Sequence, residues 1–302
     1  MIRYYAVSMS WPVYTFAHIP DLPHLHPPAL VAVFGDPVAH SRSPQMHNPG
    51  LAARELEAQY VRLQIKPEEF VTAVHACRKA GFAGINCTIP HKLAALAVAD
   101  EVDPLARRLG AVNTLVFREN KILGYNTDGP GLLRALDEEF SLPLANQRIL
   151  ILGAGGGAGR AAAIQCALAG CAGLTLVNRT KEKVERLAHE LGAFYRSDRL
   201  SLQTEPDLSD IDLVINASSV GMKPQESPLA ATSVLKSHHH VYDMIYSPPE
   251  TAMLAAARTA GARAANGLSM LLHQGAASFE YWFGAPAPLE AMRRGLLDSL
   301  TE

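Results

Sequence analysis

The sequence has only four cysteines among its 302 residues, and no two of them form a C-x-x-C pair. This spacing argues against a disulfide framework and against a zinc site, and it fits reduced thiols in a cytosolic protein. An excess of one charge is also missing, because 27 Lys and Arg oppose 29 Asp and Glu to give a net charge of −2. A balanced charge gives no reason to expect nucleic acid or a charged membrane surface as a partner.

Long apolar runs are scarce, and no stretch has the pattern of a signal peptide. Residues 161–177 carry no charge, but they are slightly short for a membrane span and contain Gln165, Gly170 and Gly173. A buried helix followed by a buried strand accounts better for this stretch, so we expect a cytoplasmic protein with no membrane partner. No metal site is expected either, because three adjacent histidines on a strand, residues 238–240, cannot all face one ion.

A glycine-rich stretch lies near the middle of the chain. The apolar run Ile149–Leu152 stops at Gly153, and an alanine-rich helical pattern starts at Ala158. Gly153 permits a tight turn, Gly155 lets a pyrophosphate approach the backbone, and Ala158 in the third position lets helix and strand pack closely. The helix N-terminus then presents free N–H groups and a partial positive charge to phosphate. This context predicts a dinucleotide-binding turn; the alternative is a glycine-rich surface turn beside a solvated helix.

The end of the next predicted strand, residues 174–177, indicates which dinucleotide binds. An NAD enzyme usually has Asp or Glu at this point, to hold the ribose 2′-hydroxyl. This chain has Asn178-Arg179-Thr180 instead, followed by Lys181 and Lys183. A 2′-phosphate needs cations, and a guanidinium can hold it with two hydrogen bonds. The sequence therefore predicts NADP(H) rather than NAD(H).

The length allows two domains of ordinary size. From Ile149 onward, predicted strands and helices alternate, which implies a parallel, doubly wound sheet that binds ligands at the carboxyl ends of its strands. Asn216-Ala217-Ser218, Asp243 and Tyr246 fall at such ends. Further strands and helices are predicted before Ile149, and two more helices near the C-terminus. Their expected ranges are 30–34, 60–65, 113–117 and 122–125 for strands, and 67–80, 100–109, 132–140, 267–283 and 287–300 for helices.

Two serines precede the first predicted helix. Pro44 suits the first position of a helix, which makes Ser43 a candidate N-cap. Ser41 and Ser43 equally suit an anionic ligand such as a carboxylate at a helix start. Pro49-Gly50, inside the same helical pattern, is expected to kink or restart the helix.

Other polar residues also lie next to predicted strands and helices. Asn86 and Thr88 alternate with apolar residues, as at the end of a strand. Lys92 falls in the first turn of a helix, where a cation opposes the macrodipole, which points to function rather than to a solvated surface lysine. Thr127 and Asp128 precede another helix, and either of them is also a simple capping residue.

Seven short motifs occur in one order along the chain. They are Gly35-x-Pro37-x-x-His40-Ser41-x-Ser43-Pro44, Asn86-x-Thr88-x-Pro90-x-Lys92, Ala111-Val112-Asn113-Thr114, Asn126-Thr127-Asp128-Gly129, Gly153-Ala154-Gly155-Gly156, Asn178-Arg179-Thr180 and Gly267-Leu268-x-Met270-Leu271-x-x-Gln274. Over about residues 30 to 295 the chain resembles the shikimate dehydrogenases. The resemblance implies an α/β fold with an N-terminal α/β substrate domain, a Rossmann-like, doubly wound NADP-binding domain, and C-terminal helices that return to the first domain.

The resemblance also implies where the domains lie and what they do. The substrate domain is expected at residues 30–129, completed by 268–302, and the NADP domain at 130–267, with residues 1–29 as an N-terminal extension of unassigned role. Members reduce 3-dehydroshikimate to shikimate with NADPH, in chorismate and aromatic amino-acid biosynthesis. By position, Lys92 and Asp128 match the catalytic pair. The substrate-binding positions match Ser41, Ser43, Asn86, Thr88, Asn113, Tyr246 and Gln274.

The cofactor positions complete the expected site. They match Gly153, Ala154, Gly155, Gly156, Gly157, Asn178, Arg179, Thr180, Lys183, Ser218, Met244 and Gly267. An enzyme of the same fold that acts on quinate, or on both acids, is an alternative, as is a non-catalytic NADP-binding regulator. The presence of both Lys92 and Asp128 speaks against the regulator. The expected partner is a small-molecule substrate, with the protein a monomer or homodimer.

Overall fold

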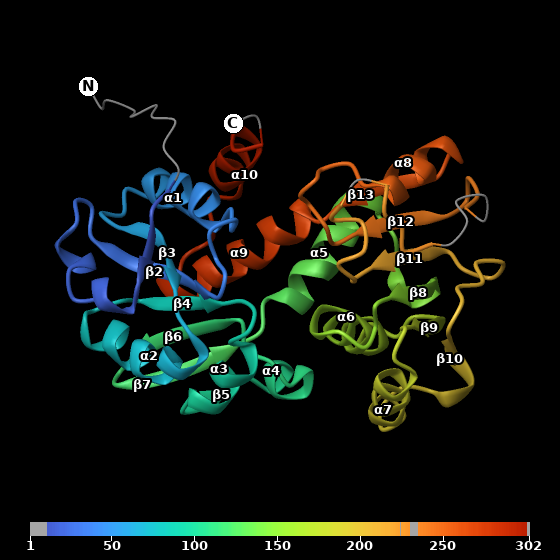
Figure 1. Ribbon diagram of the computed structural model, residues 1–302, viewed down its shortest axis with the longest axis horizontal. Helices are drawn as coiled ribbons and strands as arrows, with labels where there is room; N and C mark the ends of the chain where they lie inside the picture. The colour runs from blue at the N-terminus through green and yellow to red at the C-terminus, as the bar shows by residue number, and fades with distance from the viewer. Residues whose placement is uncertain (1–10, 224, 230–234, 301–302) are drawn as a thin grey trace. The chain divides into compact units, whose positions relative to one another are not determined.

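The computed structural model describes residues 11–223, 225–229 and 235–300. The chain divides into two compact units, the first formed by Met1–Thr127 with Gln274–Glu302 and the second by Asp128–His273 (Figure 1). The sequence predicts boundaries after residues 129 and 267, and the structure divides the chain after residues 127 and 273.

The first unit is built on a mixed sheet. Its strands are β1 (Val13–Thr15), β2 (Ala29–Gly35), β3 (Gln59–Gln64), β4 (Gly84–Cys87), β5 (Glu101–Val102), β6 (Thr114–Arg118) and β7 (Lys121–Tyr125). Among the described residues they follow the order β1-β3-β2-β4-β6-β7-β5. The pairs among β1, β3, β2 and β4 are parallel, whereas β6 runs antiparallel to both β4 and β7.

Helices cover both faces of this sheet, which explains why the central strand β2 is apolar throughout. The helices are α1 (Ser43–Ala53), α2 (Phe70–Lys79), α3 (Lys92–Val98), α4 (Pro104–Leu109), α10 (Leu289–Asp298) and the part of α9 (Leu268–Phe283) from Gln274 onward, with 3-10 turns η1 (Phe16–His18), η2 (Leu22–His24) and η3 (Pro67–Glu69). Phe34 of β2 packs in one core cluster with Phe70 of α2. Val33, on the opposite face, packs with Phe279 and Trp282 of α9. The unit therefore has three layers, with the sheet in the middle.

The first helix continues through Pro49 and Gly50, so the predicted restart is wrong. A proline at position 49 removes the N–H that would bond to the carbonyl of Gln45. In this protein the surface that results is covered by α10. A Cβ added to Gly295 would meet the Gln45 carbonyl oxygen and the Pro49 ring, and one added to Gly50 would lie 2.7 Å from Met292. The Pro-Gly pair thus forms the surface against which α10 packs.

Part of the N-terminal extension belongs to the first unit. Residues 13–15 add the edge strand β1 in parallel to β3. Ile19 and Leu22 are 1% exposed and lie in the core cluster with Phe34. Arg62 of β3 donates a hydrogen bond of 3.0 Å to the carbonyl of Trp11. From residue 11 onward the extension is therefore packed and hydrogen-bonded, and the first ten residues lie outside the described part.

Within its described residues, the second unit contains a parallel sheet of six strands. Its elements are α5 (Asp128–Phe140), η4 (Leu144–Asn146), β8 (Arg148–Leu152), α6 (Gly157–Leu168), β9 (Gly173–Val177), α7 (Lys181–Leu191), η5 (Ser197–Arg199), β10 (Leu200–Gln203), β11 (Leu213–Asn216), β12 (His240–Asp243), α8 (Ala252–Thr259) and β13 (Arg263–Asn266). The order β10-β9-β8-β11-β12-β13 is the Rossmann order 3-2-1-4-5-6. Successive strands are added on one side of β8 up to β10 and on its other side from β11 onward. In such sheets, ligands bind at the carboxyl ends of the strands near the point where the order changes side, here between β8 and β11.

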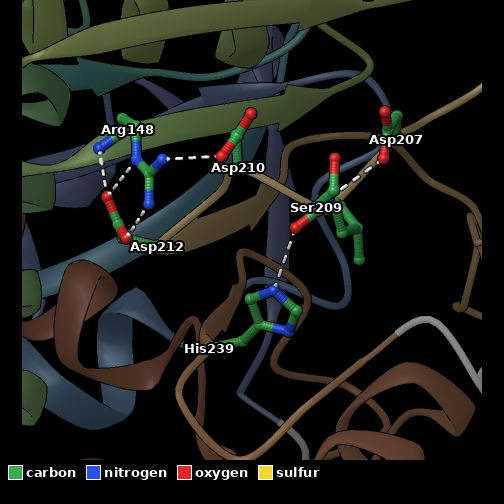
Figure 2. Close-up of polar contacts among 7 residues, drawn as sticks. Arg148, Asp207, Ser209, Asp210, Asp212 and His239 are labelled. Atoms are coloured by element: carbon green, nitrogen blue, oxygen red, sulfur yellow. Dashed lines mark hydrogen bonds and ion pairs between the residues drawn. The ribbon is translucent and has the colours of Figure 1, made fainter.

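The opposite, amino-terminal end of this sheet is tied together by charges (Figure 2). The guanidinium of Arg148 contacts Asp210 and Asp212 at 3.0 Å each, and the backbone N–H of Arg148 donates to Asp212 at 2.8 Å. These hydrogen bonds hold the pKa of Asp212 below its usual range. Nearby, both ring nitrogens of His239 bond to the backbone, at Lys236 and at Leu208. His239 is therefore engaged in structural contacts.

All four cysteines are buried thiols that form no disulfide. The Cys171 sulfur lies 3.3 Å from the Tyr195 hydroxyl. Burial raises the pKa values of all four thiols, which keeps them protonated and unreactive. Across the described ranges, no helix combines the length and the apolar character needed to cross a bilayer.

Candidate functional site

The glycine turn of the second unit joins β8 to α6. Gly153 has a φ of +76°, in the left-handed region that favours glycine, as the tight turn requires. The N–H of Gly156 bonds to the Gly153 carbonyl at 2.9 Å. Gly155 is closely surrounded, because an added Cβ would lie 2.8 Å from both the Asn178 side chain and Lys183. The missing side chain at Gly155 thus makes room for the end of the next strand and for α7.

The packing position between the turn and α6 is Gly159, so the prediction of Ala158 for this role is wrong. Ala158 is exposed, whereas Gly159 is buried. A Cβ on Gly159 would lie 2.7 Å from the Ala154 Cα and would overlap the Gly153 carbonyl oxygen. The helix begins at Gly157, so Gly159 lies in its first turn. Its backbone N–H groups and the positive end of the helix dipole lie beside the carboxyl end of β8, where a phosphate is stabilised.

The residues after β9 lie next to this turn. Asn178 accepts a hydrogen bond from the Gly155 N–H at 3.2 Å and donates one to the Thr180 carbonyl at 3.0 Å. Arg179, Thr180 and Lys183 are exposed. Lys183 also lines a hollow of about 310 Å³ together with Gly155, Arg160, Arg186, Leu187 and Glu190. The structure therefore places a cationic surface beside the glycine turn, as the sequence predicts for a 2′-phosphate.

The buried carboxylate of Asp243 positions the residues that follow β11. Asp243, at the end of β12, accepts hydrogen bonds from Asn216 at 2.9 Å and from Thr251 at 2.7 Å. Burial raises the pKa of Asp243, and these hydrogen bonds oppose that effect. The amide oxygen of Asn216 accepts from the N–H and the hydroxyl of Ser218, at 3.0 and 2.7 Å. Ser218 in turn packs on the turn, because a Cβ on Gly153 would lie 2.8 Å from its Cβ.

The last predicted cofactor positions are also neighbours. Met244 follows β12, and Gly267 follows β13, the adjacent strand. A Cβ on Gly267 would overlap the Met244 carbonyl, and the Gly267 N–H bonds to the Ile245 carbonyl at 3.2 Å. Tyr246, a predicted substrate residue, is half-buried in the loop that follows Met244 and Ile245. The second unit thus collects the predicted cofactor residues at the carboxyl ends of β8, β9, β11, β12 and β13.

In the first unit, the two predicted serines lie side by side. The Ser41 hydroxyl donates to the Ser43 hydroxyl at 3.2 Å. The N-cap of α1 is Arg42 and Ser43 is already helical, so the alternative of Ser43 as the capping residue is wrong. The carbonyl of Ser41 accepts from the Nε of Arg62 at 2.8 Å, which fixes the loop before the helix. The buried Ser43 hydroxyl is therefore held beside that of Ser41.

Asn86 of β4 is the centre of a buried polar cluster. Its Oδ1 accepts from the Tyr60 hydroxyl at 2.8 Å. Its Nδ2 faces the Asn113 carbonyl at 3.2 Å, the Thr114 hydroxyl at 3.1 Å and the Ser278 hydroxyl at 2.9 Å. A cluster so fully hydrogen-bonded holds its members in one arrangement. The side-chain orientation of Asn86 is thus fixed before any ligand arrives.

Asn113 is held by the same cluster, through residues that the sequence reasoning did not assign. Its side chain donates to the Thr127 hydroxyl at 2.9 Å and accepts from the Thr127 N–H at 2.8 Å. Ser278, on α9, lies 2.8 Å from Thr114 and 3.2 Å from Thr127. Gln274, one turn earlier on α9, accepts the Ser278 hydroxyl at its backbone carbonyl. The one weak signal for these contacts in the sequence is that Thr114 and Thr127 stand beside motif residues.

Thr88 and Lys92 follow β4, where the chain turns into α3. A Cβ on Gly35 would lie 2.6 Å from the Thr88 methyl group, so Thr88 packs against the end of β2. Lys92 is the first residue of α3 and is half-buried. Burial raises the pKa of the Cys87 thiol, and the positive charge of Lys92 opposes that effect. Asp128, the other predicted catalytic residue, is half-buried and begins α5 in the second unit.

The arrangement so far defines a class of protein. The sheet has the Rossmann strand order, a glycine turn after β8, and cationic side chains after β9. This combination is typical of dehydrogenases whose dinucleotide carries a 2′-phosphate. Three family descriptions match the chain in sequence: the shikimate dehydrogenase substrate-binding domain at residues 33–115, shikimate/quinate 5-dehydrogenase at 135–225, and the shikimate 5′-dehydrogenase C-terminal domain at 267–297.

Complete relatives show the same likeness. The NADP⁺-dependent shikimate dehydrogenase of Symbiobacterium thermophilum is 41% identical over 282 residues, which cover 91% of this chain and 95% of that protein. A shikimate dehydrogenase solved with NADP⁺ superposes with a TM-score of 0.84 at 36% identity, covering 91% of this chain and 96% of the other. The enzyme of Thermus thermophilus, solved with NADP(H) and shikimate, has a TM-score of 0.81 at 36% identity, with coverage of 89% and 99%. The chain belongs to the shikimate dehydrogenase family.

Proposed function

We propose that the protein reduces 3-dehydroshikimate to shikimate with NADPH, a step on the route to chorismate and the aromatic amino acids. The observation that carries this proposal is the preformed polar cluster around Asn86, at the end of β4. A pocket that fixes several hydrogen-bonding groups before binding favours a rigid, polyhydroxylated acid over an apolar ligand. The relatives of this chain include a shikimate dehydrogenase named for NADP⁺ and another that was solved with NADP⁺.

The substrate residues divide by the group they recognise. The hydroxyls of Ser41 and Ser43, adjacent at the start of α1, hold the carboxylate. The ring hydroxyls are bound by Asn86, Thr88, Asn113 and Gln274, and Tyr246 supplies one further contact. Uncharged donors and acceptors suit this task, because each hydroxyl both donates and accepts a hydrogen bond.

The reaction needs a cation and a proton at the ketone oxygen. NADPH, when bound, supplies the hydride that reduces the ketone carbon. Lys92 places positive charge beside the oxygen, where negative charge develops, and donates the proton that forms the new hydroxyl. Asp128 accepts a hydrogen bond from the same hydroxyl and orients Lys92.

Cofactor choice rests on the end of β9. The exposed guanidinium of Arg179 and the ammonium of Lys183 bind the 2′-phosphate of NADP(H), and Asn178 holds the strand end against the glycine turn. Charge-assisted hydrogen bonds of this kind are about twice as strong as neutral ones. The pyrophosphate would be held by residues 153–157 and the first turn of α6, and Ser218, Met244 and Gly267 would complete the cofactor site. We further propose a cytoplasmic enzyme that acts as a monomer or homodimer.

The catalytic assignment is tested by Lys92→Met. Loss of a group that both stabilises charge and donates a proton is expected to lower kcat about 100-fold or more, with KM for shikimate changed far less. The matched control is Lys79→Met, because Lys79 is an exposed lysine at the end of α2 of the same unit. A Lys92→Met enzyme with the kcat of the wild type would remove Lys92 from the chemistry.

A further inference from the structure

A buried arginine of β3 contacts the loop that carries the serine pair. Arg62 lies within the strand and is 5% exposed. Its Nε donates a hydrogen bond of 2.8 Å to the backbone carbonyl of Ser41, and its Nη2 donates to the same carbonyl. Nη2 also donates at 3.1 Å to the side-chain oxygen of Gln45, in the first turn of α1. One guanidinium therefore holds both the loop before α1 and the start of the helix.

The N-terminal extension anchors the same guanidinium from the edge of the sheet. Nη1 of Arg62 donates at 3.0 Å to the backbone carbonyl of Trp11. Two residues later, Val13 is the register partner of Arg62 in the parallel pairing of β1 with β3. A guanidinium is planar and rigid, so fixing Nη1 at Trp11 also fixes the direction in which Nε and Nη2 point. The extension thus aims Arg62 at the Ser41 carbonyl.

The carbonyl that Arg62 holds determines where the Ser41 hydroxyl lies. The carbonyl carbon and the Cβ of Ser41 are both bonded to its Cα, so a shift of this peptide group also moves the hydroxyl. On the other side of the residue, the Ser41 N–H bonds to the Val38 carbonyl at 3.0 Å. The hydroxyl itself donates to Ser43 at 3.2 Å. The geometry of the serine pair therefore depends on a side chain from a different strand.

We propose that Arg62 is a positioning residue for the substrate carboxylate. Its guanidinium, anchored by the N-terminal extension, sets the place of the Ser41 hydroxyl that receives the carboxylate. This inference rests on the proposed function, because it takes the carboxylate-binding role of the serine pair from there. Hydrogen bonds to a carboxylate are short and charge-assisted, so their strength depends closely on the position of the donor. Arg62 acts through Ser41 and need not touch the substrate.

The variant Arg62→Lys tests this role. Lysine keeps the positive charge and the aliphatic stem, but replaces the planar fork by a single ammonium. We expect Kd for shikimate to rise about tenfold, because a displaced hydroxyl loses most of a charge-assisted hydrogen bond. The value of kcat at saturating shikimate should change less than about threefold, since the reacting groups are not altered. Wild-type affinity for shikimate in Arg62→Lys, measured by isothermal titration, would overturn the proposal.

Arg78→Lys is the matched control. Arg78, on α2 of the same unit, also donates through Nη1 to a backbone carbonyl, that of Asn120 at 2.5 Å. The control therefore removes an equivalent guanidinium–carbonyl contact away from the serine pair. Its affinity for shikimate should equal that of the wild type. A loss in Arg78→Lys as large as that in Arg62→Lys would refute a specific role for Arg62.

A double-mutant cycle separates action through Ser41 from general support of the fold. Ser41→Ala removes the hydroxyl but keeps the backbone carbonyl that Arg62 holds. In the Ser41→Ala background, Arg62→Lys should raise Kd for shikimate by less than about threefold, because the group that it positions is already absent. A full tenfold rise in this background would show that Arg62 does not act through Ser41, and would refute the proposal.

A second variant tests the same fork with the buried cation left in place. Gln45→Leu removes one of the acceptors of Arg62. It should raise Kd for shikimate about threefold in the wild-type background and leave it unchanged in Ser41→Ala. Equal effects in both backgrounds would contradict the proposal, even where Arg62→Lys does not fold.

The outcome for the wild type distinguishes this inference from the proposed function. A wild type that does not bind shikimate would overturn the assignment of the site and the role of Arg62 with it. A wild type that binds and oxidises shikimate, but in which the effects of Arg62→Lys and Ser41→Ala are additive, would overturn the role of Arg62 alone.

Discussion

Gly159 lies so close to the backbone of the glycine turn that no side chain fits there, and Gly159→Ala tests this requirement. A Cβ at this position would lie 2.7 Å from the Ala154 Cα, whereas ordinary contact begins at 3.4 Å. The first turn of α6 must therefore retreat by roughly 0.7 Å, because its neighbour is backbone and cannot rotate away. Overpacking of this kind costs about 1–3 kcal/mol. The better helix propensity of alanine returns about 1 kcal/mol.

The expected net loss of stability is thus up to about 2 kcal/mol, which corresponds to a decrease of roughly 4–8 °C in Tm. The larger effect is expected on NADPH, because the displaced turn carries the N–H groups proposed for the pyrophosphate. We expect Kd for NADPH to rise at least about tenfold, while Kd for shikimate stays unchanged. Isothermal titration and thermal unfolding measure both quantities.

Gly192→Ala is the matched control for this substitution. Gly192 has helical backbone angles at the end of α7, and a Cβ there would meet its nearest neighbour at 3.4 Å, an ordinary contact. Its Tm and NADPH affinity should equal or slightly exceed those of the wild type, since the substitution lowers the entropy of the unfolded chain. A Gly159→Ala protein that binds NADPH and unfolds like this control would refute the packing role of Gly159.

Two further predictions concern single side chains. Burial lowers the pKa of His47 from 6.5 to about 3. Between these pH values, the unfolded state therefore binds a proton that the folded state does not. The free energy of unfolding should fall by about 1.4 kcal/mol per pH unit as the pH decreases through this range. Urea unfolding at pH 5 and pH 7 measures this pH dependence of the free energy of unfolding. It should be lost in His47→Phe but kept in His75→Phe, which replaces an exposed histidine. An unchanged pH dependence in His47→Phe would contradict the argument. Arg179→Asp removes the proposed 2′-phosphate partner and adds the acid that a ribose hydroxyl prefers, so the ratio of NADPH to NADH affinity should fall at least about tenfold. A ratio equal to that of the wild type in competitive titrations would assign the 2′-phosphate to other residues.

The long, regular elements of the fold could be predicted from the sequence. The helix predicted at 267–283 is observed at Leu268–Phe283, and the strand predicted at 122–125 is observed at Lys121–Tyr125, because apolar periodicity marks these elements. The strands β1, β5, β10 and β13 were missed. Three of them, β1, β5 and β10, are short strands with partly exposed residues, and β13 has the sequence Arg-Ala-Ala-Asn, which lacks the β-branched residues that favour strands. Such strands are stabilised by their neighbours in the sheet rather than by local preference.

Local motifs of the candidate site could be recognised in the sequence, whereas contacts between distant segments could not. The glycine turn and the Asn178 segment are local, and the structure brings them together through the Gly155–Asn178 hydrogen bond. Tyr60 and Ser278 could not be predicted, because their contacts with Asn86 join positions 26 and 192 residues apart. The error at Pro49 has the same origin, since the helix continues there because α10, far along the chain, packs against it.

The central claim is tested most directly by initial rates of dinucleotide reduction with shikimate and with quinate, each measured with NADP⁺ and with NAD⁺. The site is expected to give a strong preference for shikimate, because a pocket built to bind the additional hydroxyl of quinate would favour quinate strongly, and no residue of the proposed site is assigned to that hydroxyl. The cationic surface at Arg179 and Lys183 is expected to give a strong preference for NADP⁺. Comparable rates with quinate, or faster reduction of NAD⁺, would contradict the assignment of substrate or cofactor respectively.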